Sequence, residues 1–442
     1  MVGVATSEGA TAPPGPRGQF LAGNLQAYEE DRLAFLLAAE RDYGPIVTFD
    51  RRTTIVNDAE RVQEMLHDRS GRFAIRQNFL LEDIPEHELH AWLGVRRLFN
   101  PGLRRPRVQG FATVVADLVD EVLGGVAGRQ VVAVDLLEQI TSRAMARYCF
   151  GHEDRGVPEA AGRLLDALAE VVGNPFALPP SMPTPARRRI RRRLRELKAL
   201  LEPLVLARMH RPGDFGDYAA TVIDGRDEER GQTVDRVLMT LIGTMLAAHR
   251  VPAAATAWAL KLSRGDAATW KALRLESEAH LARRSVGEGS ALTDLPVTIA
   301  VVQESLRLYP PTWLLSREAT TSVQVGGYWF AAGHQFLISP YVLHRQSAAF
   351  PDPEGFRPER WQETTPAMRA HYLPFGAGGR ACPGSHLAMV MMTSTLLAAA
   401  RWDVRVGGDG VRADPRTTLL PNGLVLEVVG RARDRGDLSG GR

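Results

Sequence analysis

One ten-residue stretch, residues 375–384, constrains this chain more than any other. It reads Phe-Gly-Ala-Gly-Gly-Arg-Ala-Cys-Pro-Gly, and an apolar helical run follows it. Proline is favoured at the first position of a helix, so Cys382 is predicted to lie at a helix N-terminus. There the free backbone N–H groups and the helix dipole stabilise a thiolate. The glycines permit tight turns and close approach of the backbone to a flat partner.

The residues around this cysteine suit heme. A thiolate can bind the iron, and Arg380, two residues earlier, supplies a cation suited to a propionate carboxylate. A structural cysteine beside a glycine-rich loop is the alternative, and it would be the better reading of a lone cysteine. The combined spacing of the glycines, Arg380 and Cys382 favours heme instead.

The same stretch resembles the heme-binding loop of the cytochrome P450 superfamily. Its pattern F-x-x-G-x-R-x-C-x-G matches that loop at every fixed position. Further matches occur in the family's order between about residues 13 and 430. Trp92 and Arg96 are similar to the family's W-x-x-x-R segment, and Arg317 stands where the family places another propionate-binding arginine.

A second group of matches consists of charged residues. Glu304 and Arg307 resemble the family's E-x-x-R pair, and Arg360 resembles the third member of that set. Glu304 and Arg307 would lie on one helix face. A buried ion network of this kind is tolerated only if every member is paired. We expect it to hold the segment that presents Cys382 and to take no part in the chemistry.

The resemblance implies a fold, a cofactor and a set of binding residues. The fold would be mostly α (α+β), a single triangular helical domain with small β-sheets. The cofactor would be heme b, with Cys382 as the axial ligand of its iron. The implied cofactor-binding residues are Trp92, Arg96, Arg317, Phe375, Gly376, Arg380, Cys382 and Gly384.

The length and the periodicity favour one large domain. Hydrophobic residues make up 45% of the 442 residues, which is ample for a core and argues against disorder. Strand-like segments occur at both ends with helical patterns between them, as in an interwoven α+β domain. We expect an extended lead-in over 1–18, a heme-thiolate catalytic domain over 19–430 and a polar tail over 431–442.

The cysteine count and the apolar runs indicate the compartment. Two cysteines argue against a disulfide framework, and Cys149, in an apolar run, is expected to be a small buried hydrophobe. The chain shows neither a secretory N-terminus nor a run of 18 apolar residues, so we expect a cytoplasmic protein without a membrane anchor. The net charge of +3 is too small to predict a nucleic-acid partner.

The expected pocket points to a hydrophobic small molecule. Its lining would come from the loop 70–88, the region near 174–186, Ala248, Val251 and residues 313–315, which are mainly apolar. The resemblance and the arginine-rich composition suggest a monomer in bacterial secondary metabolism, such as antibiotic biosynthesis. A ferredoxin and its reductase are conceivable electron donors. A basic docking face near the heme loop would be formed by Arg96, Arg97, Arg104, Arg105 and Arg107.

The central helix, expected over about 233–263, departs from the family. The family pattern A-[AG]-x-[DE]-T-[TS] falls on residues 247–252, where Arg250 replaces the acid, Val251 the alcohol and Pro252 the next hydroxyl. In ordinary members, the acid and alcohol pass protons to iron-bound dioxygen. Val251 has no proton to give, and Arg250 stays protonated at any working pH. Pro252 cannot donate to the carbonyl of Ala248, so the helix should kink there.

Ala248, Arg250 and Val251 are therefore the candidate catalytic positions, and three functions stay open. The first is a non-standard oxidant, either peroxide or a preactivated N–O or O–O substrate, including nitrene-type transfer. The second is an ordinary O2-dependent monooxygenase in which substrate or water delivers protons. The third is a non-catalytic heme sensor. The loss of all three relay positions favours the first. Arg250 would either pair with an anionic substrate group or be solvated or salt-bridged.

Overall fold

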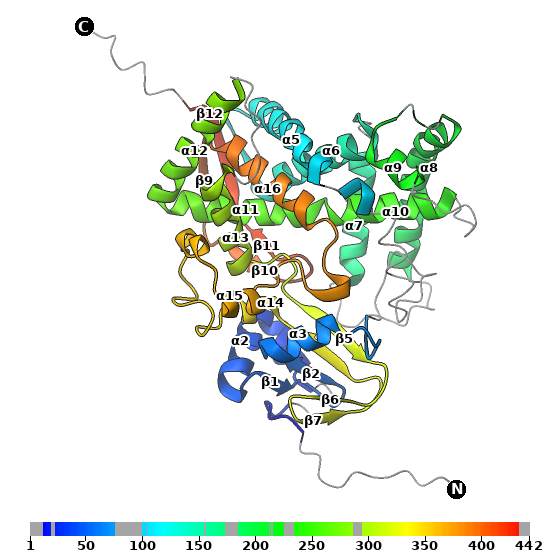
Figure 1. The fold of residues 1–442 in the computed structure, drawn as a ribbon, viewed down its shortest axis with the longest axis vertical. Coiled ribbons are helices and arrows are strands. Elements are labelled where there is room, and N and C mark those ends of the chain that lie inside the picture. The colour runs from blue at the N-terminus through cyan, green and yellow to red at the C-terminus, as the bar shows by residue number, and fades with distance from the viewer. Residues whose placement is uncertain are drawn as a thin grey trace. The chain divides into compact units, whose positions relative to one another are not determined.

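The computed structural model in Figure 1 describes most of the chain. The described residues are 12–18, 23–75, 100–103, 105–153, 156–172, 184–211, 213, 215–224, 234–285 and 294–432. Unit 1 comprises Met1–Arg96, Thr312–Gly355 and Glu363–Cys382, and unit 2 comprises Arg97–Pro311, Phe356–Gln362 and Pro383–Arg442. Each compact unit combines segments far apart in the sequence, so neither is one continuous piece of chain. The single domain expected over 19–430 stays a prediction.

Unit 1 is built around a five-stranded sheet. Its strand order is β1-β2-β8-β5-β3, with β2 and β8 parallel and the other neighbours antiparallel. The strands are β1 (Ile46–Thr48), β2 (Thr53–Val56), β3 (Phe73–Ala74), β5 (Leu315–Ala319) and β8 (Gln335–Ile338), and a hairpin of β6 (Val323–Val325) and β7 (Tyr328–Phe330) accompanies them. Its short helices are α1 (Leu25–Glu30), α2 (Arg32–Tyr43), α3 (Ala59–His67), α14 (Pro340–Leu343), α15 (Pro366–His371) and the 3-10 turn η5 (Gly378–Arg380).

Helix α3 shows how the sequence sets this packing. Asp58 caps it by accepting a hydrogen bond from the Arg61 N–H at 3.1 Å. Val62, Met65 and Leu66 follow at helical spacing and are buried in a core shared with the strands of the sheet. This packing fixes the C-terminal end of α3, which contacts η5 in the segment before Cys382.

Unit 2 is mostly helical. Its longer helices are α5 (Arg105–Gly125), α6 (Ala133–Phe150), α7 (Gly156–Val172), α8 (Pro185–His210), α9 (Tyr218–Asp224), α10 (Val234–Ala247), α11 (Arg250–Gly265), α12 (Ala267–Ser285), α13 (Pro296–Leu308) and α16 (Ser385–Ala399). Two 3-10 turns, η1 (Asn100–Leu103) and η4 (Pro358–Gln362), accompany them. The strands are β4 (Arg129–Val132), β9 (Trp402–Gly407) and β12 (Val425–Arg431) in one sheet, and β10 (Arg412–Asp414) and β11 (Leu420–Asn422) in another. The predicted mostly α fold with small sheets is confirmed.

The segment Val234–Gly265 is long and apolar enough to cross a membrane, judged by length and composition alone. Its most apolar window is 61% buried within the structure, which is typical of the core helix of a globular protein. The same segment is interrupted between α10 and α11.

Cys149 lies on α6 and is completely buried, as predicted. Burial raises the pKa of its thiol far above its usual range, so the side chain stays neutral and unreactive. We expect Cys149→Ala to lower the free energy of unfolding by about 1–2 kcal/mol, because it leaves a small cavity. Urea unfolding and a turnover assay on the same preparation check this. A variant of normal stability that had lost turnover would contradict the structural role.

Candidate functional site

The cysteine loop is closed by its own backbone in unit 1. The N–H of Cys382 donates to the Phe375 carbonyl at 2.8 Å, and the side chain of Cys382 is exposed. Gly376 and Gly378 have φ angles of +64° and +68°, which disfavour a side chain. A Cβ atom on Gly378 would also collide with the carbonyl of Leu66 at the end of α3. The loop therefore needs glycine there and presents an accessible thiol.

The helix after the loop starts later than predicted. It begins at Ser385 with Gly384 as its N-cap, so Pro383 lies before the helix and does not occupy its first position. Glycine is an accepted N-cap residue, and its backbone makes the turn into the helix there. Cys382 remains three residues before the first helical residue.

Two arginines lie close together beside this loop. Arg317 on β5 is buried, and its Nη1 donates to the Ser316 carbonyl at 2.8 Å. Burial, and next the positive charge of Arg380, lower the pKa of Arg317 to about 10. Both arginines line a small cleft with residues of α3 and the segment after it. A like-charged neighbour in a buried setting favours an anion, so this pair of arginines has the charge that a heme propionate requires, although Asp68 also lines the cleft.

The predicted charged set forms in unit 2. Arg307 donates to both oxygens of Glu304, at 2.9 Å from Nε and 2.8 Å from Nη2, and Nε of Arg360 donates to Oε1 at 3.0 Å. The backbone N–H of Arg357 and Nε1 of Trp361 donate to the same carboxylate, each at 2.9 Å. The side chains of Glu304 and Arg307 are 0% exposed. The predicted pairing of Glu304 with both arginines is confirmed.

The central helix is interrupted at the predicted place. Helix α10 ends at Ala247 and α11 begins at Arg250. Pro252 is thus the third residue of α11, in the first turn, where a backbone N–H has no acceptor within the helix, so the break leaves the proline at a position that tolerates it. The predicted kink is confirmed, in the form of a two-residue break.

A strip of small side chains runs along one face of this interrupted helix. Gly243, Thr244, Ala248 and Val251 are partly open and Ala247 is exposed, whereas the intervening Met245, Leu246 and His249 are buried. The open positions repeat at helical spacing. Small side chains on one face allow a flat group such as a porphyrin to approach closely. The strip therefore fits the expected role of Ala248 and Val251 beside the cofactor.

Arg250 is held by carboxylates of two other helices. Its Nε lies 2.5 Å from Oε1 of Glu138 on α6, and its Nη2 lies 2.8 Å from Oδ1 of Asp166 on α7. Burial alone would lower the pKa of Arg250, but the hydrogen bonds and the charge of Glu138 outweigh it and raise that pKa. Of the two expectations for Arg250, the structure shows the salt-bridged side chain and not one available to an anionic substrate.

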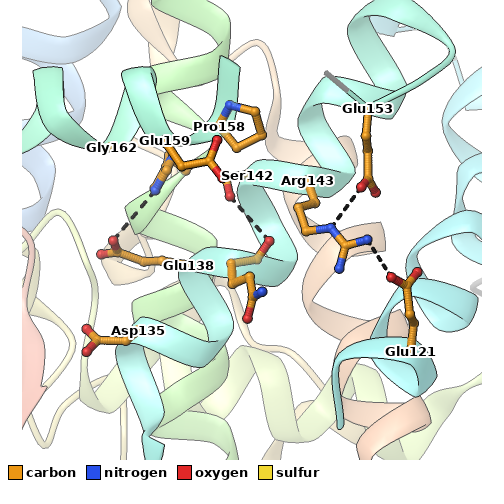
Figure 2. Close-up of a pocket in the computed structure, with 11 residues that line it drawn as sticks. Glu121, Asp135, Glu138, Ser142, Arg143, Glu153, Pro158, Glu159 and Gly162 are labelled. Atoms are coloured by element: carbon orange, nitrogen blue, oxygen red, sulfur yellow. Dashed lines mark hydrogen bonds and ion pairs between the residues drawn. The ribbon is translucent and has the colours of Figure 1, made fainter. Parts of the chain in front are cut away.

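A pocket of about 490 Å³ is lined by Glu138 of α6 and by His249 at the break, and Figure 2 shows Glu138 and other residues that line it. It is lined by Glu121, Asp135, Glu138, Gln139, Ser142, Arg143, Glu153, Pro158, Glu159, Gly162 and His249. Burial acts to raise the pKa of Glu138, but the nearby His249 and the hydrogen bonds from Arg250 lower it overall. Burial, and then the charge of Glu138, raise the pKa of Asp135. Sequence reasoning missed this pocket, because its carboxylates come from α5, α6, α7 and the segment between α6 and α7, with no shared local pattern.

Several predicted site residues fall outside the described part of the chain. They are Trp92, Arg96, Arg97, Arg104, residues 76–88 of the expected loop 70–88, and residues 174–183 of the region near 174–186. Of the arginines expected on a docking face, Arg107 bonds within the protein, to the Thr221 hydroxyl and the Gly216 carbonyl. Trp313 is buried, and its carbonyl accepts a hydrogen bond from Ser339 at 3.0 Å.

Comparisons with known proteins agree with these observations. The Cytochrome P450 family model matches residues 13–402. Cyclooctat-9-en-7-ol 5-monooxygenase of Streptomyces melanosporofaciens is 30% identical over 325 residues, which is 70% of each chain. Cyclooctatin synthase of the same organism is 31% identical over 349 residues, 75% of each chain. This chain therefore belongs to the cytochrome P450 family and is an oxidoreductase of that type with heme b as its cofactor.

Proposed function

We propose that this P450 oxidises a hydrophobic small molecule of bacterial secondary metabolism with an oxidant other than dioxygen plus electrons. The observation that carries the proposal is the state of the proton-relay positions. Arg250 is locked between Glu138 and Asp166, Val251 has no ionisable hydrogen, and Pro252 has no N–H. None of the three can deliver a proton to a reacting atom.

The residues proposed to bind the cofactor are those expected from the sequence. Cys382 would bind the iron of heme b through its thiolate, and Arg317 and Arg380 would bind propionate. Phe375, Gly376 and Gly384 would shape the loop, with Trp92 and Arg96 as further propionate contacts. Bound in this way, heme b would supply oxidation chemistry, which the Cys382 thiolate would favour by donating electron density to the iron.

With hydrogen peroxide as the oxidant, the reaction would need no external protons from the central helix. One of its oxygen atoms enters a C–H bond of the substrate as hydroxyl and the other leaves as water, so no external electrons or protons are consumed. A preactivated substrate with an N–O or O–O bond would serve equally, including in nitrene-type transfer. Around such a reaction, Val251 and Ala248 would offer an apolar surface that keeps ordered water away from the oxidant.

An ordinary O2-dependent monooxygenase is the second candidate. The observation that favours it is the relative named Cyclooctat-9-en-7-ol 5-monooxygenase. A water molecule or a hydroxyl of the substrate would then deliver the protons, and a ferredoxin with its reductase would supply electrons. The name of this relative also suggests a cyclic unsaturated alcohol as the substrate class.

Product formation under three conditions separates these candidates, with cyclooctat-9-en-7-ol as the first probe substrate in the two conditions that supply an external oxidant. The conditions are peroxide without reductase, a ferredoxin system in air, and strict anaerobiosis with a preactivated substrate. We expect product in the first or third condition. Product in air with the ferredoxin system and in neither of the others would overturn the proposal and establish the second candidate.

Val251→Thr tests the same point within the protein. Under the proposed function the restored hydroxyl has no task, so product formed per oxidant consumed should stay within about twofold of wild type. If protons limit an ordinary reaction with dioxygen, a positioned acid should raise it by about tenfold or more. Val251→Ala is the matched control, because it changes the volume at this position without adding a hydroxyl.

A further inference from the structure

Helix α6 holds the interrupted turn of the central helix through two residues one turn apart. The hydroxyl of Thr141 donates to the carbonyl of His249 at 2.5 Å. Glu138 accepts from Nε of Arg250 at 2.5 Å, and its other oxygen lies 3.6 Å from Nε2 of His249. Residues three apart share a helix face, so Glu138 and Thr141 form a single contact surface for the turn.

The turn needs such contacts because its own backbone holds it weakly. The N–H of Ala248 donates to the Thr244 carbonyl at 3.1 Å, and that of His249 reaches the Leu246 carbonyl at 3.4 Å, which is long for this kind of bond. Pro252 has no N–H with which to continue the pattern toward the carbonyl of Ala248. The backbone hydrogen bonds described at this turn are therefore weaker than those of an uninterrupted helix.

Burial makes the α6 contacts strong. The side chains of Glu138, Arg250 and His249 are 16%, 17% and 6% exposed, so water competes little for their hydrogen bonds. Asp166, the other partner of Arg250, is 69% exposed, and ion pairs with exposed carboxylates contribute little. Glu138 is thus the anchor of Arg250, and Asp166 is a natural control at the same guanidinium.

We propose that Glu138 and Thr141 are positioning residues of this enzyme. By fixing His249 and Arg250 they set the place of Ala248 and Val251, which occupy the open strip on the same turn. This inference rests on the proposed placement of that turn beside the reacting atoms, but not on the identity of the oxidant. Neither residue needs to touch the substrate.

The test compares Glu138→Gln and Thr141→Val with Asp166→Asn in the heme-loaded enzyme. The first readout is hydrogen–deuterium exchange across residues 247–255. We expect exchange there to rise by about tenfold in both α6 variants and to stay at the wild-type rate in Asp166→Asn. A wild-type exchange rate in both α6 variants would show that α6 does not hold the turn.

The second readout is spectral titration with imidazole, which binds heme iron at the position open to the oxidant. We expect its dissociation constant to change by about tenfold in the α6 variants and to stay unchanged in Asp166→Asn, at an unaltered thiolate-type band. Faster exchange with unchanged imidazole affinity would make the contacts purely structural and overturn the positioning role. Because the titration needs no turnover, it is independent of the outcome of the peroxide assay. If Glu138→Gln does not fold, the comparison of Thr141→Val with Asp166→Asn is sufficient to test the proposal.

Discussion

We expect Cys382→Ala to lose the thiolate-type ferrous–carbonyl band together with all turnover. The chain has two cysteines, and the structure separates their roles. Cys382 is exposed at the end of a loop closed by the bond between its N–H and the Phe375 carbonyl. Alanine keeps that backbone bond and removes only the sulfur. The loss should therefore come from missing iron ligation and not from an altered loop.

The matched control is Cys149→Ala, which removes the same atom from a buried site. It should keep the thiolate band and turnover while losing some stability. Circular dichroism of Cys382→Ala should match wild type, because the loop conformation depends on Gly376 and Gly378. A thiolate-type band that survives in Cys382→Ala and disappears in Cys149→Ala would show that Cys149, and not Cys382, is the iron ligand.

Local signals were sufficient for much of the fold and for part of the site. The helical patterns expected between the two strand-containing ends are confirmed by helices such as α6 and α13, in which buried residues recur at helical spacing. The cysteine loop and the pairing of Glu304 with Arg307 also follow from short spacings. Each of these features involves residues that are close together in the sequence, so a local sequence pattern can predict it.

The contacts that the sequence did not reveal join distant residues. Glu138 and Arg250 are 112 positions apart, and Thr141 and His249 are 108 positions apart. Nothing in either local pattern indicates the partner, so the sequence leaves the state of Arg250 open and only the packing of α6 against α11 defines it. The break at Ala248 was predictable for the opposite reason, because Pro252 imposes it locally.

The second large effect is expected at Glu304. Its carboxylate receives donors from Arg307, Arg360, Arg357 and Trp361 in a fully buried position. Glu304→Ala leaves the buried guanidinium of Arg307 without its carboxylate partner. Breaking a buried ion pair from one side costs about 3–5 kcal/mol, which is a large part of the stability of a typical protein. We expect a large fall in the urea midpoint and little soluble protein at 37 °C.

Glu359→Gln provides the control from the neighbouring turn. Glu359 pairs with Nε of Arg357 at 3.0 Å, but its side chain is 56% exposed, so its loss should cost less than about 1 kcal/mol. Similar urea midpoints for the two variants would contradict the buried network as a source of stability.

The network around Glu304 is also expected to hold the segment that presents Cys382, and the intensity of the thiolate-type band per folded molecule tests this role. All members of the network lie in unit 2, whereas Cys382 lies in unit 1. A folded Glu304→Ala fraction with a reduced thiolate band would show that the network also supports presentation of Cys382, and a full band would restrict it to stability.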